Sequence, residues 1–311
     1  MKYFLRKFFN FLIFSIFLIS IVLGIWSYTM KFSLLEIPAP ELSDSFSLNE
    51  KLRFIKNKKI KVLALGSSMT LINIDSKSMI KFFNTEKFIN AGSWGMSMKD
   101  ILTILKLLNQ KDNIEKLVIT SNICDFFAVD KDIKTENIEQ YFKNKIDLIT
   151  YIKTFNLKYF IKNYPYLNFT NSNNRHYESL CFDKNGGVPL SYKNFRFDKK
   201  RWGNADLGLP TKKNYNNLHQ IIKFCKKNHI KLYFFQSPIR NGLLKEKVKV
   251  EINKHITKIR KLVSCQENVY FINSTDKKWK DNLFVDGTHF NEKGSKEFTN
   301  YCLSKIKNES N

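Results

Sequence analysis

The stretch from Lys59 to Thr70, KIKVLALGSSMT, constrains the fold of this chain most strongly. Its apolar run, residues 60–65, ends at Gly66 and is followed at once by side chains that carry hydroxyl groups. A short apolar run ended by glycine is typical of a buried strand in an α/β sheet. Because ligands and chemistry sit at the carboxyl ends of such strands, a serine placed there is a candidate nucleophile, provided that a base can reach it.

The N-terminus predicts a membrane helix. Residues 8–29 are almost wholly apolar, and the few residues before them include Lys2, Arg6 and Lys7. About 20 apolar residues are enough for a helix to cross a bilayer, and basic residues in front of it predict a cytoplasmic N-terminus. A cleaved signal peptide is the alternative, but the apolar run is long for one and no small-x-small cleavage site follows Gly24. We therefore expect an uncleaved anchor.

Three segments follow from this pattern: an anchor over residues 1–31, a juxtamembrane linker with a short helix over 32–58, and a folded domain over 59–311. Strands and helices alternate in the domain. The strands are expected at 60–65, 88–90, 117–120, 231–236 and 269–272, and the helices at 75–84, 98–109, 213–228, 244–263 and 291–306. Such alternation predicts a parallel sheet covered on both faces, here an α/β, flavodoxin-like three-layer sandwich with five strands in the order 2-1-3-4-5.

Residues 126–212 interrupt the alternation. This segment is rich in asparagine, lysine and aromatic residues and contains the turn sequence Asn185-Gly186-Gly187. A loop of this length inside a compact domain is usually functional or carries small elements of its own. We expect an inserted cap near the carboxyl edge of the sheet, and a surface for a polysaccharide or for single-stranded nucleic acid is the alternative.

Charge and cysteine content narrow the function classes. With 52 basic and 28 acidic residues, the net charge is +24, which favours anionic surroundings such as lipid headgroups or phosphate-bearing polymers. A compositional bias explains the scattered lysines equally well. The five cysteines are an odd number without C-x-x-C spacing, so neither a zinc site nor a complete disulfide framework follows. We expect neither a metal nor a cofactor.

A candidate base stands near the C-terminus in LFVDGTHFNEKGSKEF. Asp286 and His289 lie three residues apart, which can place the carboxylate on one imidazole nitrogen and leave the other to deprotonate a serine. The segment follows the last expected strand, on the same sheet edge as Ser68. Taken alone, the pair could equally cap a turn before the last helix.

Two further segments could hold an oxyanion. FINAGSWG, residues 88–95, is a short strand that enters a loop with two glycines, and the backbone N–H of Gly95 is a candidate donor. LVITSN, residues 117–122, is a strand that ends at Asn122, whose side-chain amide is a second candidate. A plain turn at Gly95 and a turn cap at Asn122 are the alternatives.

In this order the four blocks resemble the SGNH (GDSL-like) hydrolase superfamily, over residues 59–125 and 231–305. The resemblance implies the SGNH hydrolase fold and a set of site residues: Ser68 as nucleophile, His289 as base, Asp286 as its orienting acid, and Gly95 and Asn122 as oxyanion donors. Two positions depart from the family pattern. Ser67 stands where an aspartate is more usual, and Asn122 lacks the usual glycines before it and the aspartate after it.

The anchor gives the chain the plan of membrane-tethered SGNH proteins, which act in polysaccharide O-acetylation and in D-alanyl transfer to teichoic acids (the DltD-like group). The resemblance implies a serine esterase or O-acyltransferase that acts on acetyl or D-alanyl esters outside the bacterial cytoplasmic membrane. Its partners would be an acylated polysaccharide or teichoic-acid-like polymer, the membrane and a multispanning acyltransferase. A catalytically silent scaffold for such an acyltransferase and a lipase or thioesterase are the alternatives, whereas the anchor argues against a nucleic-acid-binding module.

Overall fold

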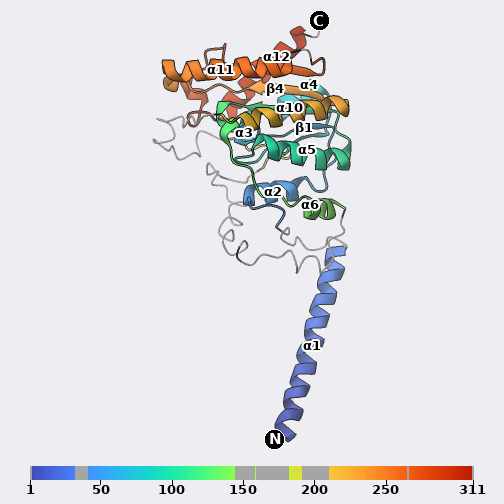
Figure 1. Cartoon of the computed structure of the whole chain (residues 1–311). Coiled ribbons are helices and arrows are strands. Elements are labelled where there is room, and N and C mark those ends of the chain that lie inside the picture. Colours follow the sequence, from blue (N-terminus) through green and yellow to red (C-terminus); the bar gives the residue numbers. More distant parts are fainter. Residues whose placement is uncertain are drawn as a thin grey trace.

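The computed structural model describes residues 2–31, 41–143, 158, 182–190, 210–264 and 266–309 (Figure 1). The strands are β1 (Val62–Ala64), β2 (Phe88–Asn90), β3 (Lys116–Ser121), β4 (Lys231–Gln236) and β5 (Val269–Asn273). The helices are α1 (Lys2–Lys31), α2 (Phe46–Ile55), α3 (Ser68–Asn73), α4 (Ser76–Phe83), α5 (Met98–Asp112), α6 (Thr135–Phe142), α10 (Lys212–Lys227), α11 (Glu246–Val263) and α12 (Glu292–Glu309), with 3-10 turns η1 (Ile123–Phe127), η4 (Asn241–Leu243) and η5 (Asp281–Leu283).

All five strands are parallel, in the order β2-β1-β3-β4-β5. The predicted strand number and order are therefore confirmed. β3 and β4 are paired along their whole length, from Lys116 opposite Lys231 to Ser121 opposite Gln236. Because every strand runs the same way, the segments that follow β1, β2 and β3 leave the sheet at one edge.

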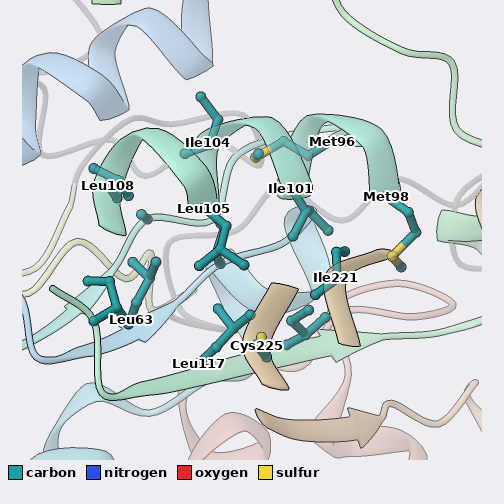
Figure 2. Packing of buried hydrophobic residues seen from close by; sticks show 14 of the residues in the cluster. Leu63, Met96, Met98, Ile101, Ile104, Leu105, Leu108, Leu117, Ile221 and Cys225 are labelled. Carbon is teal, nitrogen blue, oxygen red and sulfur yellow. The ribbon is translucent and has the colours of Figure 1, made fainter. Parts of the chain in front are cut away.

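Helices cover both faces of the sheet. Side chains alternate along β1, so that Leu63 faces α5 and α10, whereas Val62 and Ala64 face α4 and α12. Figure 2 shows the first of these layers, where leucines and isoleucines of α5 pack on Leu63 and Leu117 beside Ile221 and Cys225 of α10. Burial of both faces explains the nearly continuous apolar sequence of the inner strands.

Residues 41–58 pack on the domain, although the sequence predicts a linker for 32–58. The short helix expected in this segment is α2, and its Leu48, Leu52 and Ile55 are fully buried in the same core as α5. Next to α2 lies α6, whose Ile138 joins this core. Figure 1 shows α2 and α6 as an outer layer beyond α5. Residues 32–40 lie outside the described part of the chain.

A buried lysine holds the segment 182–190 to the edge of the sheet. Lys51 of α2 is 1% exposed, and its Nζ donates hydrogen bonds to the carbonyl oxygens of Asn90 and Gly186. Its ammonium also lies 3.7 Å from the ring centre of Phe182. Gly186 has a φ of +94°, and a side chain there would overlap the Asn90 carbonyl oxygen, so this turn requires glycine.

The remaining part of the predicted cap, residues 144–157, 159–181 and 191–209, lies outside the described residues. Cys124, Cys225 and Cys302 are free thiols, while Cys181 and Cys265 are not among the described residues. In the described part of the chain, one helical stretch is long and apolar enough to cross a membrane, Lys2–Ile25 of α1. Such a helix suits a membrane span or a signal anchor.

Candidate functional site

A tight turn carries Ser68 from β1 into α3. Ser67 is the N-cap of α3, and its Oγ accepts a hydrogen bond from the backbone N–H of Met69 at 3.1 Å. Ser68 is the first residue of the helix, where backbone N–H groups have no partner within the helix. Gly66 makes the turn possible, because a Cβ at this position would overlap Thr70 Oγ1.

Thr70 fastens α3 to the neighbouring strand β3. Its Oγ1 donates to the carbonyl oxygen of Thr120 at 2.9 Å and accepts from the N–H of Thr120 at 2.9 Å. Both residues are fully buried. Because Ser68 begins α3 and Thr70 bonds α3 to β3, the position of Ser68 relative to the sheet is fixed.

The second part of the site is the loop between η5 and α12. Asp286 Oδ1 accepts hydrogen bonds from the backbone N–H groups of Thr288 and His289, each at 2.8 Å. Its other oxygen, Oδ2, lies 2.8 Å from Nδ1 of His289. These bonds fix the carboxylate and turn the imidazole so that Nε2 faces away from it.

The two parts meet. Nε2 of His289 lies 2.8 Å from Oγ of Ser68, although the residues are 221 positions apart in sequence. Ser68, His289 and Asp286 therefore form one continuous chain of hydrogen bonds, in the geometry that lets an imidazole take a proton from a hydroxyl group.

Asn73, at the end of α3, connects the helix to the histidine loop. Its Nδ2 donates to the carbonyl oxygen of Thr288 at 3.2 Å and to Ser237 Oγ at 2.9 Å, and its Oδ1 accepts from the N–H of Phe290 at 2.8 Å. These bonds flank His289 on both sides. Asn73 was not among the residues predicted for the site, and the sequence offers only its place five positions after Ser68 as a signal.

The site is largely shielded from water. Ser68 is 9% exposed, His289 6% and Asp286 5%. The indole of Trp94 lies beside the imidazole, with 5.7 Å between the ring centres. Shielding of this kind strengthens the hydrogen bonds in the chain, because less water competes for them.

The two candidate oxyanion donors lie in segments next to the nucleophile turn. The loop of Gly95 is held to that turn by a hydrogen bond from Ser93 N to Gly66 O at 3.0 Å, and Gly95 itself has a φ of +61°, which favours glycine. Asn122 caps η1 through its Oδ1, while its Nδ2 lies 3.3 Å from Met69 Sδ, a weak acceptor. Among the described contacts neither group bonds to Ser68, so their role as oxyanion donors stays a prediction.

Asp125 is the buried acid that the sequence analysis missed. Its carboxylate accepts a hydrogen bond from Asn122 N at 3.2 Å, and the hydroxyl groups of Ser67 and Ser121 lie close enough to stabilise its charge. Burial raises the pKa of Asp125, and these hydrogen bonds and the nearby His289 oppose the rise. The spacing Asn122-x-x-Asp125 is a capping-box pattern, so a signal was present in the sequence.

The described residues contain no cluster of three or more His, Cys, Asp or Glu side chains that could hold a metal ion. Comparison with known proteins brings no relative, since no family model matches the sequence and no curated protein matches it. The geometry of Ser68, His289 and Asp286 is therefore the main indication of a function.

Proposed function

We propose that this protein is a membrane-anchored serine esterase or O-acyltransferase of the SGNH type that acts on acyl esters of a bacterial cell-envelope polymer. One observation carries the proposal: the unbroken hydrogen-bonded order of Ser68 Oγ, the His289 imidazole and the Asp286 carboxylate, at 2.8 Å in each step. A serine hydroxyl needs such a base to become a nucleophile at neutral pH.

In the proposed reaction, Ser68 Oγ attacks the ester carbonyl carbon while Nε2 of His289 accepts the hydroxyl proton. Asp286 keeps the other imidazole proton on Nδ1 and stabilises the imidazolium that forms. His289 then returns the proton to the departing alcohol, which leaves the acyl group on Ser68. Water or a sugar hydroxyl, deprotonated by the same imidazole, takes up the acyl group and frees the serine.

The developing oxyanion needs donors that are in place before the reaction. Gly95 N–H, the Asn122 amide and the N–H of Ser68 are assigned this role in the proposal. Each such donor lowers the barrier by about 3–4 kcal/mol in related chemistry. The φ of +61° at Gly95 supports this assignment, because this conformation favours glycine, which has no side chain of its own beside the N–H group.

The proposed location is the outer side of the cytoplasmic membrane, with residues 1–31 as a single-pass anchor and the N-terminus in the cytoplasm. Support comes from the apolar stretch of α1 and the basic residues at its start. The net charge of +24 suits an anionic substrate such as a teichoic-acid-like polymer or an acidic acylated polysaccharide. A multispanning acyltransferase that supplies the acyl group is the proposed protein partner.

Covalent labelling with a fluorophosphonate tests the proposal. The wild-type protein and a Ser304→Ala control, altered on the exposed side of α12, are expected to label equally, whereas Ser68→Ala and His289→Ala are expected to lose labelling. Strong labelling of the Ser68→Ala protein would refute the assignment. An unlabelled wild-type protein that co-purifies with a multispanning acyltransferase would instead identify a catalytically silent scaffold.

A further inference from the structure

A cavity of about 510 Å³ lies on the outer layer of the domain, away from Ser68. Its wall is formed by the C-terminal ends of three helices, α2, α5 and α6, together with the segment that leads into β1. The lining side chains include five lysines and a single acidic residue: Lys56, Lys58, Lys59, Lys111, Lys143 and Glu139. A cavity of this charge is suited to an anion.

Three of these lysines already form an ion pair with a carboxylate. Lys111 lies 2.5 Å and Lys59 3.9 Å from the carboxylate of Asp112, and Lys143 lies 3.6 Å from that of Glu139. Lys111 also donates to the carbonyl oxygen of Lys58 at 2.7 Å. These contacts fix part of the wall but leave its net charge positive.

Lys56 and Lys58 differ from the other three. Within residues 41–143 and the other described ranges, neither forms an ion pair. Their ammonium groups lie over aromatic rings, 4.2 Å from the centre of Tyr141 and 5.1 Å from that of Phe54, as that of Lys111 does over Phe142 at 5.8 Å. Stacking on a ring holds an ammonium in place without neutralising it. Burial lowers the pKa of Lys56, and an anion nearby would oppose this effect.

The covalent chain keeps this layer near α1. Only residues 32–40 separate α1 from Glu41, and the ten residue steps from Lys31 to Glu41 span about 36 Å at most. Glu41 lies 3.7 Å from Lys134, just before α6, and α2 begins a few residues further on and is about 15 Å long. Both helices thus start close to the anchored end of the domain and end at the cavity.

We propose that the lysine-lined cavity binds the phosphodiester headgroup of an anionic phospholipid, with Lys56 and Lys58 as its main cationic contacts. A phosphodiester carries one negative charge and accepts hydrogen bonds from ammonium groups, whereas the choline of a zwitterionic lipid adds a cation that this wall repels. Binding here would hold the domain at a fixed orientation on the bilayer and is independent of chemistry at Ser68.

The test uses the full chain in a neutral detergent and measures lipid binding by native mass spectrometry. Dioctanoyl-phosphatidylglycerol is expected to bind at least about tenfold more tightly than dioctanoyl-phosphatidylcholine. Glycerol 3-phosphate tests whether the site binds a lipid headgroup or a soluble phosphate compound. Weak binding of glycerol 3-phosphate supports a lipid site, whereas binding as tight as that of phosphatidylglycerol overturns the lipid assignment.

Matched variants locate the site. Lys56→Gln with Lys58→Gln is expected to weaken phosphatidylglycerol binding by about tenfold. The control is Lys305→Gln with Lys307→Gln, which removes two lysines that also lie over aromatic rings but belong to α12, on the opposite face of the sheet, and binding is expected to stay within about twofold.

Glu139→Gln tests whether weaker lipid binding by a variant is caused by loss of folding. It removes the acidic side chain from the wall, so phosphatidylglycerol is expected to bind about two- to fivefold more tightly, a gain that an unfolded variant cannot give. Equal loss of binding in the two double-lysine variants, or weaker binding by Glu139→Gln, would overturn the proposal. Fluorophosphonate labelling of Ser68 is expected to be the same in all of these variants as in the wild-type protein, so failure of this proposal is distinguishable from failure of the proposed activity.

Discussion

Gly66→Ala is the substitution whose consequence the structure determines most directly. The added methyl group would overlap Oγ1 of Thr70 and would lie 3.0 Å from its Cβ. Thr70 cannot move aside without loss, because its Oγ1 bonds both the N–H and the carbonyl oxygen of Thr120. The backbone at Gly66 is not in the left-handed region, so the effect is one of space rather than of backbone strain.

Three contributions determine how much Gly66→Ala changes the free energy of unfolding. Overpacking of a buried position costs about 1–3 kcal/mol, and disruption of the bonds to Thr120 adds about 1–3 kcal/mol. The smaller conformational freedom of alanine in the unfolded chain returns about 0.4–1 kcal/mol. We expect Gly66→Ala to lower the free energy of unfolding by about 2–4 kcal/mol.

A double-mutant cycle with Thr70→Ala isolates the clash. Thr70→Ala alone leaves the buried N–H of Thr120 without its acceptor and costs about 1–3 kcal/mol. In that background the added methyl group meets only Cβ of residue 70 at 3.0 Å and the Thr120 carbonyl oxygen at 3.5 Å, so Gly66→Ala is expected to cost less than about 1 kcal/mol. Urea unfolding of the four full-length proteins in a neutral detergent measures the cycle. If the loss of unfolding free energy in the double variant equals the sum of the losses in the two single variants to within about 0.5 kcal/mol, the two side chains do not compete for this space.

Two further substitutions address the acids of the site. Asp286→Asn keeps the shape of the His289 loop but favours the wrong imidazole tautomer. The rate of fluorophosphonate labelling is therefore expected to fall about 10³- to 10⁴-fold. An unchanged labelling rate would contradict the role of Asp286. Because burial raises the pKa of Asp125, the folded state binds its proton more tightly than the unfolded chain; stability is therefore lost as pH rises from about 4 through the raised pKa. Asp125→Asn is expected to flatten this part of the curve of melting temperature against pH, and an unchanged slope would contradict the assignment.

The sheet could be predicted from the sequence because its signals are local. Apolar runs ended by glycine or a polar residue mark the strands, and the helices between them leave only a parallel arrangement. The same rule predicted that Ser68 and the Asp286–His289 pair would share one edge, and the structure places them 2.8 Å apart. The sequence could not predict that Ser68 Oγ and His289 Nε2 lie within hydrogen-bond distance, because this distance depends on how α3 packs against α12.

The elements missed by the sequence analysis owe their form to tertiary contacts. α3 has only six residues, too few to show a helical period, and it forms because Ser67 caps it and all six residues are buried. A lysine is expected at the surface, so the burial of Lys51 was not foreseeable. It depends on two carbonyl oxygens and an aromatic ring that come from β2 and the segment 182–190.

The buried amide of Asn73 shows how the fold joins two distant segments into one site. Ser68 begins α3 and Asn73 ends it, so a short rigid helix separates the hydroxyl group from the amide. That amide bonds the backbone of Thr288 and Phe290, the residues on either side of His289. A shift of α3 against the sheet would therefore carry the histidine loop with it, and the distance from Ser68 Oγ to the imidazole would change less than the position of either. The described segment 182–190 adds a second connection, because Val188 N donates to Leu71 O of α3 at 3.0 Å and Glu292 N, at the start of α12, donates to Leu190 O at 2.9 Å.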